Sequence, residues 1–505
     1  MFDQILYTST RDASVRVSAA EAIARGISPE GGLYVPCSVP DFTHEELTAL
    51  IPQSYAARAE AVLRRFLCGG ALGFTEAEVA DCAAAAYGAR FDDPMIAPLR
   101  PLDDGRYMLE LWHGPTCAFK DMALQILPHL MRVSVQKTAP GQQIVILVAT
   151  SGDTGKAALE GFRDAPDTQI LAFYPQDGVS EMQRLQMITQ EGGNVGVCAI
   201  RGNFDDAQTG VKTLFTDPAV IRRLAEKGKR FSSANSINWG RLLPQIVYYV
   251  SAYLDLLRDG ALGADGVFDV AVPTGNFGNI LAAYYARRMG VPIRRLICAS
   301  NRNRVLTDFF ESGVYDGVRP FYTTTSPSMD ILVSSNLERL IYHLSGDDSG
   351  VVADLMAKMK KDRRYTVPAA VKAQTDALFS AGSGDDAEAA DTVRRTFDRE
   401  GYLLDTHTAV ALHVVDRLRA QNGDRTPVVI ASTANPYKFA PAILDALGSR
   451  ADGTPFAMLS ALHERTGVPI PAPLAALDGK QIRFTDSCDQ DVASMEAAME
   501  RLLHI

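Results

Sequence analysis

Short apolar runs alternate with helical segments along most of the chain from about residue 105. The runs are QQIVILVAT (142–150), QILAFYP (169–175), NVGVCAI (194–200), FDVAVPT (268–274), RRLICAS (294–300) and TPVVIAST (426–433). Segments with helical periodicity follow them, such as GKAALEGFRD after the first run. Runs that are apolar on both faces are typical of parallel strands covered by helices on both sides. The pattern predicts an α/β fold with open twisted parallel sheets flanked by helices.

Residues 1 to about 95 have a different character. They lack long β-branched runs and contain Ala-rich stretches such as EAEVADCAAAAYGAR (76–90), a composition that favours helices. A chain of 505 residues also exceeds what one hydrophobic core usually supports, so about two or three domains are expected. We predict that residues 1–95 form an added, mostly helical N-terminal domain.

Composition and charge exclude several classes of protein. Hydrophobic residues make up 47% of the chain and charged residues 22%, values typical of a globular protein. The net charge of −10 argues against a nucleic-acid partner, because phosphate contacts need a basic stripe. No apolar run approaches the roughly 20 residues that cross a bilayer, and the start MFDQILYTSTRDASVRV lacks the pattern of a signal peptide. We expect a cytoplasmic protein with no membrane partner.

The cysteines and histidines show no metal-binding pattern. The 7 cysteines are scattered and contain no C-x-x-C pair, and the 8 histidines show no H-E-x-x-H spacing. We therefore expect reduced thiols and no metal site.

The segment after the strand FDVAV has the form of a phosphate-binding turn. In open parallel sheets, ligands bind beyond the carboxyl ends of the strands. Glycines at such a position let backbone N–H groups converge on an anion at a helix N-terminus. An ordinary Gly-rich turn would also explain the segment, which matches neither the P-loop nor the dinucleotide fingerprint. The candidate residues are Gly275, Asn276, Phe277, Gly278 and Asn279.

Other strand ends carry further candidates for anion binding. Ser151, Asp153 and Thr154 follow the strand 142–150 and could hold a carboxylate or phosphate at a helix start. Asn235, Ser236 and Arg241 lie in the segment that ends the expected strand RFSSAN (230–235) and starts the helix LLPQIVYYV, where they could form a charge-assisted anion site. Helix caps without a ligand would use the same residues. Thr433 lies in STANPYKF (432–439), whose hydroxyls face the expected cleft or merely cap a strand.

Lys120 is the candidate for covalent chemistry. It lies in HGPTCAFKD (113–121), just beyond the apolar YMLELW. Burial beside Ala118 and Phe119 would lower the pKa of its amine, which suits Schiff-base formation. Most lysines are solvated surface charges, so the hypothesis that Lys120 forms a Schiff base depends on the motifs around it. Together they supply an amine, a phosphate cradle and two further anion sites.

These motifs resemble those of the threonine synthase family, whose members are pyridoxal-phosphate enzymes of fold-type II, similar to the tryptophan synthase β chain. The resemblance extends over most of the chain. It includes the lysine motif, YTSTR (7–11), GGLYVP (31–36), SMDI (328–331) and SNLER (335–339), which are similar to the long fungal and proteobacterial members. Asn435 and Tyr437 depart from it, since the family usually has a histidine and a small residue at these positions.

The resemblance implies a role for each candidate residue. Lys120 would bear pyridoxal 5′-phosphate, Gly275 through Asn279 would hold its phosphate, and Thr433 would meet the pyridine nitrogen. Ser151, Asp153 and Thr154 would lie at the substrate carboxylate and the 3′-oxygen of the ring. Asn235, Ser236 and Arg241 would bind the substrate phosphate, with help from Asn276.

The implied activity is that of threonine synthase, a carbon–oxygen lyase acting on phosphates that converts O-phospho-L-homoserine and water into L-threonine and phosphate by β,γ-replacement. The resemblance also implies a catalytic core over residues 96–505, a smaller mobile lobe roughly within 135–240, and a monomer.

Other activities fit the same motifs. A phospho-lyase would eliminate phosphate without adding water, and a serine or threonine dehydratase would leave the site around Arg241 unused. A non-catalytic relative would be expected to lack Lys120, which is present.

Overall fold

Two open sheets form the framework of the computed structural model, which describes residues 4–150, 152–177, 179–263, 266–449 and 453–504. The larger sheet has six strands in the order β14-β11-β10-β15-β5-β4. Their bounds are β14 (Phe379–Ser383), β11 (Ile293–Ser300), β10 (Phe268–Pro273), β15 (Val428–Ser432), β5 (Arg106–Glu110) and β4 (Leu99–Leu102). All neighbours pair in parallel except β4 and β5.

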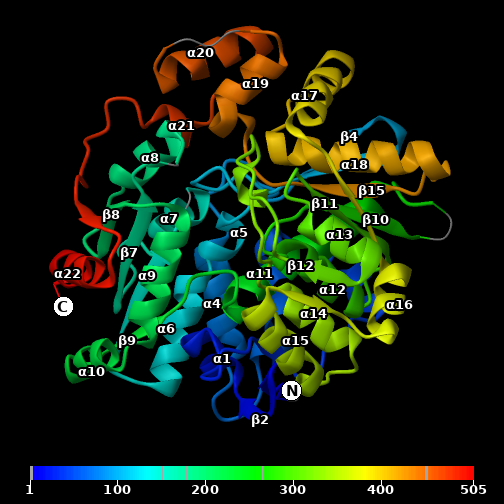
Figure 1. Ribbon diagram of the computed structural model, residues 1–505. Coiled ribbons are helices and arrows are strands. Elements are labelled where there is room, and N and C mark those ends of the chain that lie inside the picture. The colour runs from blue at the N-terminus through cyan, green and yellow to red at the C-terminus, as the bar shows by residue number, and fades with distance from the viewer. Residues whose placement is uncertain (1–3, 151, 178, 264–265, 450–452, 505) are drawn as a thin grey trace.

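The smaller sheet has five parallel strands in the order β16-β8-β7-β6-β9. They are β16 (Ser487–Asp489), β8 (Val195–Arg201), β7 (Thr168–Pro175), β6 (Gln143–Ala149) and β9 (Lys229–Ser232). Four of them fall within the range 135–240 expected for a smaller lobe. β16 comes instead from the C-terminal end of the chain, and α22 (Val492–Leu503) packs beside it (Figure 1).

Alternate residues of each strand bury opposite faces, as expected of parallel sheets covered on both sides. In β10, Val270 and Val272 join one hydrophobic cluster, whereas Ala271 joins another. α12 (Gly278–Arg288) contacts β10 and β11, and α18 (Thr406–Asn422) contacts β10, β11 and β15. The strands expected from the apolar runs are therefore confirmed, with their bounds shifted by one or two residues.

α11 (Trp239–Arg258) runs through the centre of the molecule and is buried over nearly its whole length. It contacts α12, α3 (Tyr55–Leu67) and α5 (Asp121–Leu124). Its first turn is capped by Asn238, whose side chain accepts a hydrogen bond from the backbone of Gly240. The N-terminus of this long helix therefore has a fixed place in the interior.

The N-terminal region combines helices with a small sheet. Its helices are α1 (Ala19–Arg25), α2 (His44–Ala49), α3 and α4 (Glu76–Ala86), and its antiparallel strands are β1 (Tyr7–Ser9), β2 (Asp12–Val17) and β3 (Tyr34–Pro36). Its buried residues share one hydrophobic cluster with α11, α12 and both large sheets. The boundary expected at residue 95 stays a prediction.

The remaining elements complete the helical layers and the loops between them. They are η1 (Asp103–Gly105), α6 (Leu127–Thr138), α7 (Asp153–Gly161), α8 (Glu181–Ile188), α9 (Phe204–Thr216), α10 (Pro218–Glu226), α13 (Val305–Ser312), β12 (Val314–Asp316), η2 (Pro327–Met329), α14 (Leu337–Leu344), α15 (Ser349–Asp362), β13 (Arg364–Thr366), α16 (Ala369–Leu378), α17 (Asp386–Glu400), η3 (Pro436–Phe439), α19 (Ala440–Ala446), α20 (Pro455–Thr466) and α21 (Ala472–Ala475). None of the helices within the described ranges is long and apolar enough to span a bilayer.

Arg58 joins the N-terminal region to α11 through a buried ion pair. Its Nη1 lies 2.9 Å from Oδ1 of Asp255 and 2.7 Å from Oγ of Ser251. Replacing Arg58 with Ala should destabilise the fold by about 3–5 kcal/mol, because it leaves the Asp255 carboxylate buried with a weaker set of partners. Urea unfolding measures the change. Arg25→Ala, which removes an exposed pair with Glu21, should change the free energy of unfolding by about 0.5 kcal/mol or less; equal losses in the two variants would contradict the prediction.

Candidate active site

Lys120 lies where two distant segments meet at the carboxyl end of β15. Ala118 forms a β-bridge with Ala434, and the backbone N–H of Phe119 donates to the carbonyl of Thr433 at 2.8 Å. The lysine motif is thereby fixed against the segment that follows β15. β6, β10 and β15 are all parallel strands, and ligands of open parallel sheets bind beyond the carboxyl ends of such strands.

The Lys120 amine is buried and has two close polar neighbours. Nζ donates to Oγ of Ser328 at 3.3 Å and lies 3.5 Å from Oδ2 of Asp153. Burial lowers the pKa of Lys120 to about 8, and the positive charges of Lys438 and Arg241 add to this effect, while Asp153 opposes it. About a tenth of the amine is then neutral at pH 7, far more than for an ordinary lysine, and the neutral amine is the nucleophile.

Asp153 is the first residue of α7, and its carboxylate contacts Lys120, Lys438 and Gln183. Its Oδ1 lies 2.6 Å from Nζ of Lys438 and accepts a hydrogen bond from Nε2 of Gln183 at 2.9 Å. Burial alone would raise the pKa of Asp153, but the two lysine ammonium groups outweigh it and hold that pKa well below the usual range. Gly152 precedes it with φ of 141°, a conformation that other residues rarely adopt. Thr154 follows in the first helical turn, half-buried, whereas Ser151 lies outside the described residues.

The segment from Gly275 to Asn279 has the geometry of an anion cradle. Phe277, the residue before α12, has a left-handed φ of 64°, which is rare for an aromatic residue. A Cβ atom at Gly275 would lie 2.4 Å from the carbonyl oxygen of Ser328, so only glycine fits. Asn279 is buried, and its Nδ2 has no hydrogen-bond partner, although its Oδ1 accepts from Tyr248 at 2.9 Å. This unpaired donor and the N-terminus of α12 suit a phosphate group.

The N-terminus of α11 lies beside that cradle. A Cβ atom at Gly278 would be 3.7 Å from Cβ of Ser236. Asn235 and Ser236 are half-buried just before α11. Arg241, in its first turn, is buried and donates from Nη1 to the carbonyl of Ala234 at 2.7 Å. No ion pair joins Arg241 to a carboxylate among the described residues, and burial lowers the pKa of its guanidinium to about 10. Two helix N-termini and a buried cation therefore converge.

Comparison with known proteins identifies the family to which the chain belongs. The family model "Threonine synthase N terminus" matches residues 6–87, "Pyridoxal-phosphate dependent enzyme" matches residues 104–433, which is more than half of the chain, and "Threonine synthase, C-terminal" matches residues 408–499. The chain belongs to the threonine synthase family. Its fold is accordingly the fold-type II architecture of pyridoxal-phosphate enzymes, as the motifs predicted, and pyridoxal phosphate is the cofactor of the family.

Individual relatives extend along nearly the whole chain. Threonine synthase from Pseudomonas aeruginosa is 39% identical over 91% of this chain and 94% of that protein. Threonine synthase-like 1 from Homo sapiens is 41% identical over 88% of this chain, which corresponds to only 61% of the human protein. The chain thus spans less than two thirds of that longer relative. The crystal structure of pyridoxal-phosphate-bound threonine synthase from Brucella melitensis superimposes with a TM-score of 0.86 at 36% identity, covering 99% of each chain.

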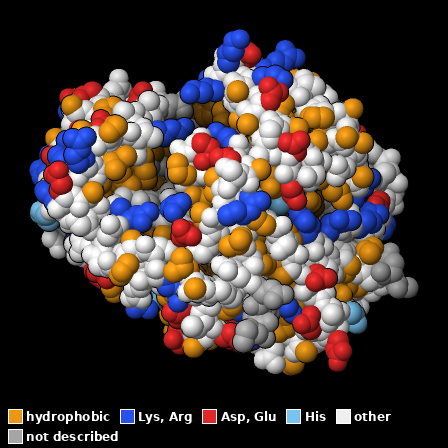
Figure 2. All heavy atoms as spheres, turned by 90° about the horizontal axis from the view of Figure 1, so that it is seen from below, with side chains coloured by type: hydrophobic (Ala, Val, Ile, Leu, Met, Phe, Trp, Pro, Cys, Tyr) orange, Lys and Arg blue, Asp and Glu red, His pale blue; other side chains and the backbone are white. Residues whose placement is uncertain are grey.

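The structure brings most of the candidate residues of this threonine synthase family member together. Lys120, Asp153 and Arg241 interact electrostatically, the 275–279 cradle contacts Ser328, and Thr433 contacts the lysine motif. Thr433 is buried, and its backbone N–H donates to Oγ1 of Thr408 at 3.3 Å. Figure 2 shows the molecule hollowed between the part that carries the five-stranded sheet and the rest, with lysine and arginine side chains around the hollow.

Several residues of the site were not among the sequence candidates. Ser328 accepts from Lys120, and its backbone N–H donates to Nε2 of His407 at 3.1 Å. Lys438 and Gln183 hold Asp153. Ser328 lies in SMDI, one of the motifs of the resemblance, and Lys438 lies in STANPYKF, the segment at the end of a predicted strand. Nothing in either local sequence indicates a contact with Lys120 or Asp153, which lie more than 200 positions away from Ser328 and Lys438 respectively. No group of three or more metal-binding side chains occurs in the part of the chain that the structure describes.

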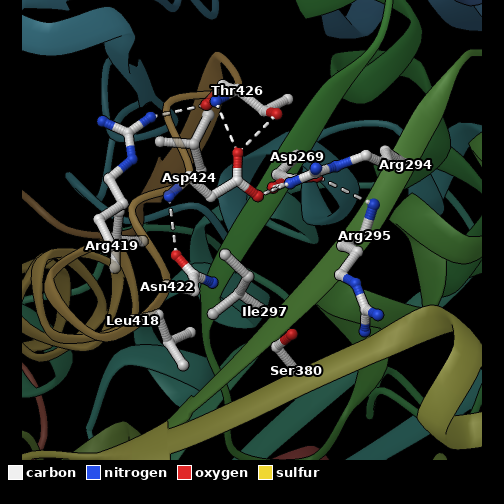
Figure 3. Close-up of a pocket in the computed structure, with 12 residues that line it drawn as sticks. Asp269, Arg294, Arg295, Ile297, Ser380, Leu418, Arg419, Asn422, Asp424 and Thr426 are labelled. Atoms are coloured by element: carbon white, nitrogen blue, oxygen red, sulfur yellow. Dashed lines mark hydrogen bonds and ion pairs between the residues drawn. The ribbon is translucent and has the colours of Figure 1, made fainter.

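A separate cavity of about 430 Å³ lies at the opposite edge of the six-stranded sheet (Figure 3). Its walls include residues at the amino ends of β10, β11 and β15, whereas Lys120 lies beyond the carboxyl end of β15. Within it, Arg294 pairs with Asp269 at 2.6 Å and also with Asp424. Arg295 and Arg419 also line this cavity and donate to backbone carbonyls. None of the candidate residues around Lys120 lines it.

Replacing Lys120 with Ala should abolish covalent attachment of the cofactor, because the described site offers Lys438 as the only other close amine, and that amine already contacts Asp153 and the carbonyl of Thr116. Wild-type protein incubated with pyridoxal phosphate should gain visible absorbance that borohydride treatment converts into a stable adduct on the peptide containing Lys120. The variant should gain no such adduct by mass spectrometry. An adduct of equal yield on another lysine would show that the assignment is wrong.

Proposed function

We propose that this chain is a threonine synthase that converts O-phospho-L-homoserine and water into L-threonine and phosphate. The observation that carries the proposal is Arg241, a buried cation without a carboxylate partner among the described residues, placed where two helix N-termini meet close to Lys120. Burying an uncompensated guanidinium is unfavourable unless an anion binds there. A phosphorylated substrate explains this arrangement, and an unphosphorylated one does not.

Pyridoxal phosphate fits the residues that surround Lys120. In the proposal Lys120 would bear it, the segment from Gly275 to Asn279 would hold its phosphate with the help of the unpaired Nδ2 of Asn279, and Thr433 would meet its ring nitrogen. When bound, the cofactor stores the negative charge that develops as bonds to the substrate carbons break. The protein supplies the placement and the charges.

The substrate phosphate is assigned to Asn235, Ser236 and Arg241, with help from Asn276. The guanidinium and the α11 N-terminus provide charge-assisted hydrogen bonds. Asp153 and Thr154, with Ser151, are assigned to the side of the substrate carboxylate and the 3′-oxygen of the ring. Because Asp153 is a carboxylate, its contact with the substrate carboxylate would be indirect, and the N–H groups that begin α7 are the better donors.

The Nζ atom of Lys120 is the proton carrier in this proposal. Ser328 and Asp153 would hold the free amine of Lys120, and its lowered pKa would let it take a proton and return it near neutral pH. Closure of the lobe around 135–240 would exclude bulk water while one water molecule reacts. The proposal includes a monomer that works in the cytoplasm.

Product analysis tests the reaction. Incubation of the purified protein with pyridoxal phosphate and O-phospho-L-homoserine should release threonine and phosphate in equal amounts. Phosphate with 2-oxobutanoate and little threonine would instead indicate a phospho-lyase. L-Serine and L-threonine as substrates serve as controls, because rapid deamination of either would favour a dehydratase and contradict the role given to Arg241.

Arg241→Ala should raise KM for O-phospho-L-homoserine about tenfold to a hundredfold, since a charge-assisted hydrogen bond to phosphate is lost. The affinity for pyridoxal phosphate, measured by fluorescence or absorbance titration, should change much less. Arg241→Lys keeps the charge and should recover part of the loss, though not the planar donor pair. A similar decrease of both affinities in Arg241→Ala would remove this residue from the substrate site.

A further inference from the structure

Lys438 is a second buried lysine beside the cofactor lysine. It lies in η3, directly after the segment that pairs with the Lys120 motif, and its side chain is 0% exposed. Its Nζ lies 2.6 Å from Oδ1 of Asp153 and donates to the carbonyl of Thr116 at 3.0 Å. Asp153 faces Lys120 with its other oxygen, Oδ2, at 3.5 Å. A single carboxylate is therefore shared by two ammonium groups, and Lys438 has the closer contact.

The charged groups around Lys120 come from several elements. Asp153 on α7 favours the ammonium form of Lys120, whereas Lys438 on η3 and Arg241 on α11 disfavour it. Asp121 on α5 lies near Lys438, and its carboxylate accepts hydrogen bonds from the backbone and side chain of Thr116. If Asp153 interacted with Lys120 alone, the buried pair would hold the amine as a cation. A cationic amine can neither capture an aldehyde nor remove a proton.

We propose that Lys438 is a positioning residue for Lys120: it holds the Asp153 carboxylate by the shorter contact, offsets its charge, and so leaves the Lys120 amine free to react. Asp153 still orients the amine from 3.5 Å, but it does not trap it as a fixed ion pair. The proposal rests on Lys120 as the attachment site and not on the identity of the substrate.

A purely structural role for Lys438 is the competing explanation. Its contact with the carbonyl of Thr116 ties η3 to the lysine motif, and this contact alone could account for a buried lysine. The two explanations predict different changes in the pKa of Lys120. An electrostatic role predicts opposite shifts when the positive and the negative neighbour of Lys120 are removed, whereas a structural role predicts the same kind of damage from both.

The experiment titrates the Lys120 amine directly in the full-length chain after its cofactor has been removed. Reductive methylation with formaldehyde and cyanoborohydride modifies neutral amines, and mass spectrometry of the peptide that contains Lys120 gives its rate from about pH 6 to about pH 11, a range that brackets lowered and ordinary lysine pKa values. The wild-type midpoint should lie near a pKa of about 8. Recapture of pyridoxal phosphate, followed by visible absorbance, should show the same midpoint.

Two variants should move this midpoint in opposite directions. Lys438→Met removes the competing cation, so the pKa of Lys120 should rise by about one unit or more, which makes the amine about tenfold less reactive at pH 7. Asp153→Asn removes the favourable carboxylate while Lys438 and Arg241 remain, so the pKa should fall by about one unit. An unchanged or lowered midpoint in Lys438→Met would overturn the proposal.

Lys156→Met serves as a matched control for the replacement of a buried lysine, and Lys438→Gln serves as an alternative variant. Lys156, on the same helix as Asp153, is also a buried lysine and pairs with Glu160 at 3.4 Å. Lys156→Met should leave the Lys120 midpoint within about 0.3 units, since no direct contact joins the two among the described residues. If Lys438→Met fails to fold by circular dichroism, Lys438→Gln and Asp153→Asn provide the two signs. Midpoints that shift together in these variants would favour the structural role.

Discussion

The parallel pairing of strands is the constraint on which the candidate site depends. Parallel strands bring their carboxyl ends to one edge of a sheet, and the segments after β6, β10 and β15 supply Asp153, the 275–279 cradle and Thr433. The lysine motif joins this edge because Ala118 pairs with Ala434 across 316 positions of sequence. Residues that are far apart along the chain thus meet at the site, and the fold of the sheets brings them together.

The site concentrates positive charge in a buried place. Lys120 interacts electrostatically with both Lys438 and Arg241, and Asp153 is the carboxylate that lies against both lysines. Such an excess is unfavourable for the empty fold, because a buried charge is stable only when paired. In the proposed function, the phosphate and carboxylate groups of the ligands would offset it. Burial lowers the pKa of the Lys120 amine, and the positive charges of Lys438 and Arg241 lower it further, so the cations that would favour anion binding also help to keep part of the amine neutral.

The sequence indicated what depends on local pattern and missed what depends on distant contacts. The long apolar runs located β6, β7, β8, β10, β11 and β15 because each buries both faces. The sequence did not predict β16, because this strand has only three residues, SCD, and is defined by its pairing with β8, about 290 positions away. Ser328 and Lys438 escaped for the same reason: a serine in a short turn and a lysine in PYKF have no local property that distinguishes them from surface residues.

The turn after β15 shows how neighbouring positions serve different purposes. The side chain of Asn435 accepts a hydrogen bond from the backbone of Tyr437 at 3.0 Å and so caps η3. The Tyr437 hydroxyl donates to the carbonyl of Val468, beyond α20, while Lys438 reaches Asp153 in the site. Asn435 and Tyr437, where the resemblance implies other residues, therefore stabilise the turn and its packing near the C-terminal helices. They hold in place the turn that carries Lys438. The side chains of Asn435 and Tyr437 contact the turn and the C-terminal region, whereas the Lys438 ammonium group contacts Asp153 in the site.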